Sequence, residues 1–160
     1  MGVTGSGKTT VGALLAGRLG ARFVDGDDFH PEANVAKMAQ GTPLTDQDRL
    51  PWLDRLVDVM DDTIADAGSV VLACSALKRM YRDRLSAGGA PAPLFIHLSG
   101  TRDLIHRRMT ARREHFMPVA LLDSQIATLE MVGPDENGLT VDIEESTDEI
   151  VHRVLTDLGH

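Results

Sequence analysis

Apolar residues occur in two alternating patterns along this chain. In some segments they recur every three or four positions, which predicts helices with one buried face: one helix starts near Lys8 and another covers 53–64. In other segments they form short continuous runs, which are typical of strands buried on both faces of a sheet. The predicted strands are 21–25, 69–73, 94–98 and 139–143. Strands separated by helices predict βαβ units and a mostly parallel sheet, so the fold class is α/β.

Capping residues refine this assignment. Thr101 can cap a helix that follows the 94–98 strand. Ser146, with Glu149 three residues later, forms a capping box and predicts a last helix with an apolar face. The main loops are expected at 87–93 and 133–138. Because no repeat or linker interrupts the pattern, we predict a single domain over residues 1–160.

Composition and charge limit the possible functions. The chain has 42% hydrophobic and 25% charged residues, as ordinary globular proteins do, and its net charge of −8 argues against a broad nucleic-acid surface. An anionic ligand must therefore meet a local cluster of donors. The single cysteine, Cys74, excludes an internal disulfide and is expected to be a buried packing residue. With no signal peptide and no apolar run of membrane-spanning length, we expect a cytoplasmic protein with no membrane association.

Residues 2–9 form a phosphate-binding loop, G-x-x-x-x-G-K-[ST]. Its glycines let consecutive backbone N–H groups point at phosphate oxygens, Lys8 can reach the β- and γ-phosphates, and the Thr9 hydroxyl can bind Mg²⁺. The expected nucleotide contacts are Gly2, Gly5, Ser6, Gly7, Lys8, Thr9 and Thr10. The alternative is a glycine-rich turn that only caps a helix. The motif predicts ATP or GTP binding and says nothing of the acceptor.

A cluster of carboxylates follows the 21–25 strand, at Asp25, Asp27 and Asp28. The carboxyl ends of parallel strands are where α/β sheets bind ligands. One of these groups could accept a hydroxyl proton or hold Mg²⁺ through water, although acidic residues here are also common turn formers. The 69–73 strand does not end in Asp, so the usual Mg²⁺ carboxylate is missing at that position.

Longer segments resemble the gluconate kinase family. The matching strings are GVTGSGKTTVG at 2–12, FVDGDDFHPEANVAKMAQGTPLTDQDRLPWL at 23–53, CSALKRMYRDRL at 74–85, RMTARREHFMPVALLDSQIATLE at 108–130 and VDI at 141–143. The resemblance implies a P-loop fold like that of nucleoside monophosphate kinases. It also implies transfer of a phosphoryl group from ATP, with Mg²⁺, to D-gluconate, giving 6-phospho-D-gluconate in a homodimeric enzyme.

The same resemblance implies residue roles. Asp27 is expected beside the transferring phosphate, as a base or a ligand of Mg²⁺-bound water. The implied lining of the gluconate pocket is Asp27, His30, Lys37, Arg49, Lys78 and Arg82. An arginine fork suits the carboxylate of gluconate, and mixed donors suit its hydroxyls. Alternatively, Arg49 and Arg82 could pair with Asp46 or Asp83 on helix surfaces.

The densest basic stretch lies between Arg102 and His115. A run of charge is usually a solvated helix face. The family pattern R-x-x-x-R-x-x-H-F instead implies a lid near 108–118, with Arg108 toward the nucleotide and Arg112 stabilising the transferring phosphoryl group.

Two rival functions and one structural expectation remain. The rivals are another small kinase of this fold, such as one for shikimate, and a nucleotide-binding module without catalytic activity. The structural expectation concerns the sheet: family members carry apolar residues before the Met-Gly of the loop, so a first strand is expected to be missing here. A protein without that strand should be poorly stable or weakly active, because its neighbours lose hydrogen-bond partners.

Overall fold

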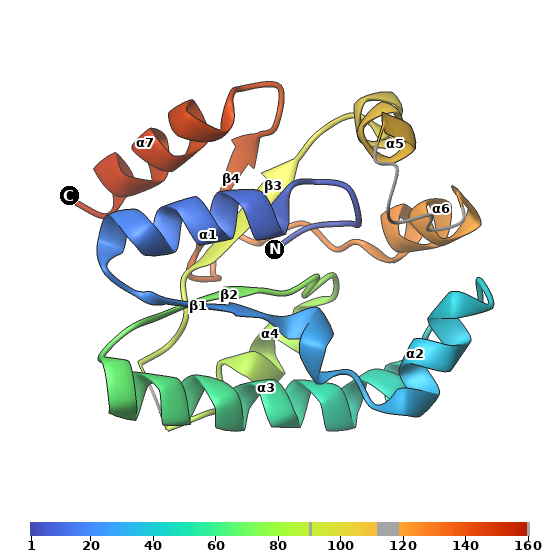
Figure 1. Ribbon diagram of the computed structural model, residues 1–160, viewed down its shortest axis with the longest axis horizontal. Helices are drawn as coiled ribbons and strands as arrows, with labels where there is room; N and C mark the ends of the chain where they lie inside the picture. Colours follow the sequence, from blue (N-terminus) through green and yellow to red (C-terminus); the bar gives the residue numbers. More distant parts are fainter. Residues whose placement is uncertain (90, 112–118, 160) are drawn as a thin grey trace.

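The computed structural model describes residues 1–89, 91–111 and 119–159, in which helices cover both sides of a set of parallel strands (Figure 1). The strands are β1 (Arg22–Asp25), β2 (Val70–Ala73), β3 (Phe95–Ser99) and β4 (Gly138–Asp142). The helices are α1 (Lys8–Leu19), α2 (Glu32–Ala39), α3 (Asp46–Ala67), α4 (Arg79–Leu85), α5 (Arg102–Ala111), α6 (Val119–Thr128) and α7 (Thr147–Asp157), with a 3₁₀ turn, η1 (Gly26–Phe29).

The strands form two parallel pairs. β1 pairs with β2, with Arg22 opposite Val70, and β3 pairs with β4, with Phe95 opposite Gly138. No ladder joins β2 to β3 within the described residues. Instead, the backbone of Met1 lies between the two pairs, in the middle of the molecule (Figure 1). The predicted α/β class with parallel strands is confirmed.

The core has two parts, one on each side of the strands. α1 and α7 bring Leu15 and Ile150 to one side, and α3 and α4 bring Leu56 and Leu85 to the other (Figure 1). α2, α5 and α6 instead gather at the carboxyl end of β1, which is the ligand-binding edge of a parallel sheet. The helices that cover the two sides of the strands do not cover the carboxyl end of β1, so we look for the functional site there.

The predicted caps are confirmed. Ser146 and Glu149 form a capping box at the start of α7, and the Thr101 hydroxyl accepts a hydrogen bond from the N–H of Leu104. α3 begins well before residue 53, because Thr45 and Asp48 form a second capping box. The helix continues through Pro51, a residue that in sequence usually marks a helix end.

One expectation about burial is wrong. The apolar run of β2 predicts a strand buried on both faces, yet Val70, Val71 and Leu72 are only partly buried. They line a cavity inside the sheet, between β2 and β3. Cys74, at the end of the same run, is buried and unoxidised as expected. Among the described helices none combines the length and apolar character needed to cross a membrane.

Candidate active site

The loop over residues 2–7 forms a tight turn that leads into α1. Gly5 and Gly7 have φ values of 77° and 97°, and Gly7 is the N-cap of α1. A Cβ on Gly5 would lie 2.6 Å from Cγ of Met109, so the loop packs directly against α5. The loop thus meets the N-terminus of a twelve-residue helix, the arrangement that binds phosphate.

The other predicted nucleotide contacts surround this turn. Gly2 has a φ of 138°, and a Cβ there would lie 2.9 Å from the carbonyl oxygen of Leu98, so only glycine fits without strain. The Ser6 hydroxyl is buried and has no hydrogen-bond partner among the described residues, while Thr10 is exposed on α1. The loop therefore has the shape that the motif predicts.

Lys8 and Thr9 are held at the mouth of the loop. Nζ of Lys8 donates to the carbonyl oxygen of Val3 over 2.9 Å, and Oγ1 of Thr9 donates to Oδ2 of Asp25 over 2.9 Å. The other carboxylate oxygen of Asp25 accepts the N–H of Asp27 over 3.1 Å. Asp25 is therefore the carboxylate nearest the predicted Mg²⁺ ligand, whereas sequence reasoning favoured Asp27.

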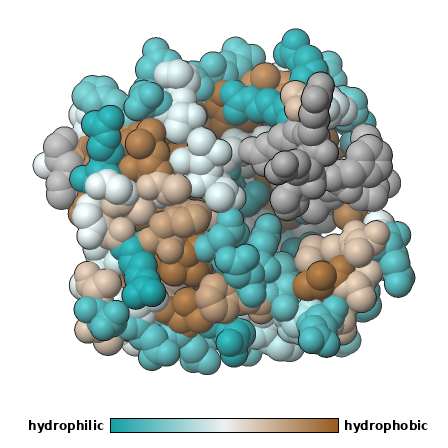
Figure 2. All heavy atoms as spheres, viewed as in Figure 1, coloured by the Kyte–Doolittle hydropathy of each residue, from teal (hydrophilic) through white to brown (hydrophobic). Residues whose placement is uncertain are grey.

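A pocket of about 70 Å³ lies beside the loop. Its lining comes from the loop, from the segment after β1, from α2 and α3, and from α6. The residues are Thr4, Lys8, Asp27, His30, Met38, Pro43, Leu44, Arg49, Ser75, Leu121, Ser124, Gln125 and Thr128. It brings together four of the predicted site residues: Lys8, Asp27, His30 and Arg49. Figure 2, drawn from the same side as Figure 1, shows a gap in the right-hand part of this face, with hydrophilic residues on its left and hydrophobic residues below it.

Asp27 and His30 form the acceptor-side pair of this pocket. Nε2 of His30 lies 3.9 Å from Oδ1 of Asp27. The Asp27 side chain is 76% exposed; partial desolvation by the surrounding protein raises its pKa, and the Lys8 ammonium acts in the opposite direction. Burial and the Arg49 charge lower the pKa of His30 to about 4, so its imidazole is neutral at pH 7.

His30 is fixed in place by its neighbours. Its ring stacks on Trp52, with centroids 4.1 Å apart, and the Trp52 indole donates to the carbonyl oxygen of Gly26 over 2.8 Å. Nδ2 of Asn34 lies 3.5 Å from Nδ1 of His30. Trp52 therefore orients a site residue from within the core.

Arg49 supplies a buried positive charge to the pocket. The residue is 8% exposed, and its guanidinium carbon lies 5.7 Å from the centre of the Tyr81 ring. Its Nε has no hydrogen-bond partner among the described residues. A buried donor without a partner is costly, so this atom is suited to bind an acidic ligand.

Three predicted pocket residues lie elsewhere. Nζ of Lys37 pairs with Asp48 over 2.7 Å, and Nζ of Lys78 pairs with Asp46 over 2.7 Å. Neither lysine lines the pocket. Both pairs brace the start of α3, the helix that carries Arg49.

Arg82 is also committed elsewhere, to a buried structural network. It is 1% exposed and forms two hydrogen bonds with the carboxylate of Glu136. Its remaining N–H groups donate to four backbone carbonyls, those of Ala76, Leu77, Glu130 and Met131. The structure therefore places Arg82 outside the pocket, and its partner is Glu136 rather than the Asp83 that its sequence suggested.

Sequence reasoning missed the contribution of α6. Ser124, Gln125 and Thr128 recur at helical spacing and bring polar side chains into the pocket. Oε1 of Gln125 accepts the N–H of Thr4 over 2.6 Å and so ties α6 to the phosphate loop. Only the helical spacing of these polar residues, inside the segment that resembles the kinase family, could have pointed to them.

The predicted lid is described only in part. Arg108, on α5, donates a hydrogen bond to the carbonyl oxygen of Ile143. Arg112 and the rest of the 112–118 segment lie outside the described residues.

Known proteins are similar to this chain in sequence and in fold. Residues 4–157 match the shikimate kinase family. The chain is 47% identical to a probable gluconokinase of Rattus norvegicus, over 97% of this chain and 93% of the rat protein. It is 44% identical to a gluconokinase of Gluconobacter oxydans, over 97% and 86% of the two chains. A crystal structure of a gluconokinase from Sinorhizobium meliloti superposes with a TM-score of 0.88 at 40% identity, covering 99% of this chain and 89% of that one.

These matches extend over nearly the whole chain, including the loop and every element that lines the pocket. The α/β fold with parallel strands agrees with them. The chain belongs to the gluconokinase family, within the shikimate kinase-like P-loop kinases.

Proposed function

We infer that this protein is a gluconokinase, which transfers the γ-phosphoryl group of ATP to D-gluconate and forms ADP and 6-phospho-D-gluconate. The observation that carries this inference is the pocket beside the phosphate loop, where a buried arginine with an unpartnered Nε faces an acidic residue and a neutral histidine. Relatives that are 44–47% identical and named gluconokinase support the choice of acceptor.

The pocket offers the donors that a sugar acid requires. The carboxylate of gluconate would pair with Arg49, because a charge-assisted hydrogen bond would satisfy the buried Nε. Neutral His30 can donate to one hydroxyl or accept from another without adding charge. Ser124, Gln125 and Thr128 would complete the contacts to the hydroxyls.

The chemistry divides between the loop and the acidic segment. Loop N–H groups and Lys8 would hold the phosphates, and Lys8 would stabilise negative charge on the transferring group. Asp27 would accept the proton of the attacking hydroxyl. The protein environment raises its pKa, which makes the carboxylate a better base than a fully solvated one.

The site fits an Mg²⁺ ion whose ligands come partly from the protein and partly from the nucleotide and water. The described residues contain no cluster of three His, Cys, Asp or Glu side chains that could hold a metal by themselves. Thr9 and Asp25 offer two adjacent oxygen donors, and Mg²⁺ commonly takes one or two such donors while phosphates and water supply the rest. The bound ion would neutralise charge on the β- and γ-phosphates.

Other parts of the proposal rest on the sequence. We assign the segment near 108–118 as a lid over the nucleotide, with Arg108 and Arg112 facing the phosphates. We also propose a cytoplasmic homodimer. Gel filtration with light scattering tests the dimer, and hydrogen exchange across 108–118 with and without ATP analogue and gluconate tests the lid.

The function is tested by identifying the product. Purified protein is incubated with ATP, Mg²⁺ and D-gluconate, and the sugar product is examined by mass spectrometry and by proton–phosphorus correlation NMR. We expect one added phosphate, coupled to the protons on C6. A product carrying phosphate on another carbon, or ADP release that does not depend on gluconate, would contradict the proposed reaction.

A further inference from the structure

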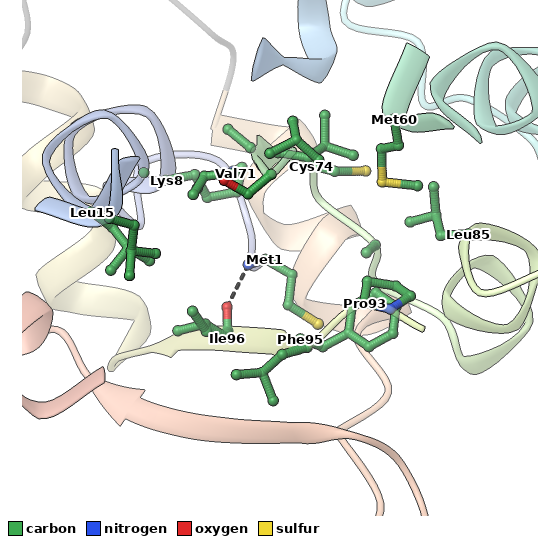
Figure 3. A pocket seen from close by; sticks show the side chains of 18 of the residues that line it. Met1, Lys8, Leu15, Met60, Val71, Cys74, Leu85, Pro93, Phe95 and Ile96 are labelled. Atoms are coloured by element: carbon green, nitrogen blue, oxygen red, sulfur yellow. Dashed lines mark hydrogen bonds between the residues drawn. The ribbon is translucent and has the colours of Figure 1, made fainter. Parts of the chain in front are cut away.

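The segment that follows β2 lies between two pockets of the protein. Cys74 and Ala76 line the apolar cavity of about 350 Å³ between β2 and β3 (Figure 3). Ser75, between them in sequence, lines the smaller pocket beside the phosphate loop, together with Lys8 and Asp27. The Ser75 hydroxyl forms no hydrogen bond with another residue in the described part of the chain. It is therefore a polar group at the acceptor pocket that the protein itself does not use.

The turn at Ala76 has a backbone conformation that is unfavourable for its residue. Ala76 has a φ of 45°, and within the described ranges it is the only residue other than glycine with a positive φ. This left-handed region brings Cβ too close to the following carbonyl oxygen. Such a conformation persists only where surrounding contacts impose it, and residues of this kind cluster at functional sites. The contacts that hold Ala76 therefore decide where the preceding side chain, that of Ser75, lies.

The three carbonyl groups of the turn, at 75–77, are all hydrogen-bonded. The Ser75 oxygen accepts the N–H of Gly2 over 3.1 Å, which ties the turn to the phosphate loop. Nη1 of Arg82 donates to the oxygen of Ala76 over 3.1 Å and to that of Leu77 over 3.3 Å. Arg82 therefore holds the residue with the positive φ through its own carbonyl group and the next one.

Arg82 can hold the turn because it is itself fixed. It is 1% exposed, and its buried partner Glu136 accepts a hydrogen bond from Nη2 over 2.9 Å. The same carboxylate accepts the N–H of Gly133 over 2.8 Å. A planar guanidinium can bond a carboxylate along one side and carbonyl oxygens with its remaining N–H groups, whereas an ammonium offers a single nitrogen. The observed set of bonds therefore requires arginine at this position.

We propose that Ser75 is a further acceptor-binding residue and that Arg82 is its positioning residue. The inference rests on the proposed transfer of a phosphoryl group to a polyhydroxy acid. The Ser75 hydroxyl would donate to one hydroxyl of the acceptor or accept from another. Arg82 does not touch the acceptor. Together with Glu136 it keeps Ala76 in the left-handed conformation, which directs Ser75 to the acceptor pocket and not to the apolar cavity.

Ser75→Ala tests the hydroxyl directly. It should lower kcat/KM for gluconate about 3- to 10-fold, the effect of one neutral hydrogen bond, with an unchanged Tm and a KM for ATP within about twofold. Ser69→Ala is the matched control, because Ser69 precedes β2 and does not line the acceptor pocket. It should leave kcat/KM for gluconate within about twofold.

A double-mutant cycle tests the positioning role. Arg82→Lys should lower Tm and shift the carbon resonances of Ala76, which report its backbone conformation. In that background Ser75→Ala should change kcat/KM for gluconate less than about twofold, because the hydroxyl is no longer directed to the acceptor. Arg79→Lys is the control: Arg79 also lies on α4, but it pairs with the exposed side chain of Asp135. In the Arg79→Lys background Ser75→Ala should keep its full effect.

The outcomes separate this proposal from the proposed function. Equal effects of Ser75→Ala in the two lysine backgrounds, or no effect in the parent protein, would overturn the proposal. If Arg82→Lys does not fold, Glu136→Gln replaces it in the same cycle. A parent protein that does not phosphorylate gluconate contradicts the proposed function, and the carbon resonances of Ala76 then decide the positioning role. A shift in Arg82→Lys that is absent in Arg79→Lys would support it, and unchanged resonances in both would overturn it.

Discussion

Replacing Arg49 with alanine should separate acceptor binding from nucleotide binding. Arg49 is the buried cation of the pocket, 8% exposed, and its Nε has no partner among the described residues. In the proposed complex it pairs with the gluconate carboxylate. Its removal should therefore raise the KM for gluconate and leave the KM for ATP nearly unchanged.

The magnitude follows from the type of bond. A hydrogen bond to a charged group contributes about 1.5–3 kcal/mol, and each 1.4 kcal/mol is a factor of ten, so we expect kcat/KM for gluconate to fall about 10- to 150-fold. Arg49→Lys should recover only part of this, because an ammonium lacks the planar fork that matches a carboxylate. Steady-state kinetics with each substrate varied in turn, in a coupled ADP assay, measure both constants.

Arg55→Ala is the matched control. Arg55 also lies on α3 and also stacks near an aromatic ring, that of Phe29 at 5.8 Å, but it is exposed and does not line the pocket. It should leave both KM values within about twofold, since surface substitutions are usually small in effect. An equal rise of both KM values in Arg49→Ala, or the same rise in Arg55→Ala, would show that Arg49 does not bind the acceptor.

The other predictions separate catalytic from structural residues. Lys8→Ala should lower kcat about 100-fold or more with an unchanged Tm, and normal turnover would refute the role of the loop lysine. Asp27→Asn should lower kcat about 10²- to 10⁴-fold; a lower Tm with kcat preserved would make Asp27 a turn residue. Arg82→Leu should lower the free energy of unfolding by about 3–5 kcal/mol, because it leaves Glu136 buried without its partner. Urea unfolding measures this change. A higher KM for gluconate with unchanged stability would instead indicate that Arg82 contacts the acceptor. Burial lowers the pKa of His97 to about 4, whereas the unfolded value is near 6.5, so its contribution to stability is complete above pH 6.5 and is lost as the pH falls toward 4, by about 2 kcal/mol at pH 5. Urea unfolding at pH 7.5 and 5 should show a smaller loss of unfolding free energy in His97→Leu than in the parent protein. Equal losses in the two proteins would show that His97 does not cause the pH dependence of stability.

The fold was predictable where local rules decide it. The loop over 2–9, the capping box at Ser146 and the apolar run of β2 each specify their element within a few residues. α2 and α4 were not foreseen, because they are only eight and seven residues long, and α6 was not foreseen although its polar residues recur at helical spacing. Their positions depend on packing against distant residues, which periodicity does not report.

The candidate site was predictable by residue type but not by partner. Arg49, Lys78 and Arg82 are all basic residues in segments that resemble the kinase family, and the sequence gives no basis for ranking them. The structure separates them through long-range contacts: Lys78 meets Asp46, and Arg82 meets Glu136, 54 residues away. Arg49 alone of these three lines the pocket. Pairings across such separations are decided by the tertiary fold, so only the structure could assign them.

The central claim is that the pocket selects gluconate as the acceptor. The most direct measurement is kcat/KM for a panel of hydroxy acids in one preparation, with D-gluconate, shikimate and a neutral hexitol such as sorbitol. A ratio within one preparation is insensitive to the overall level of activity. We predict that gluconate exceeds each of the others at least 100-fold, because the hexitol lacks the carboxylate for Arg49 and shikimate presents its hydroxyls on a rigid ring. Equal or better use of shikimate or sorbitol would contradict the assignment.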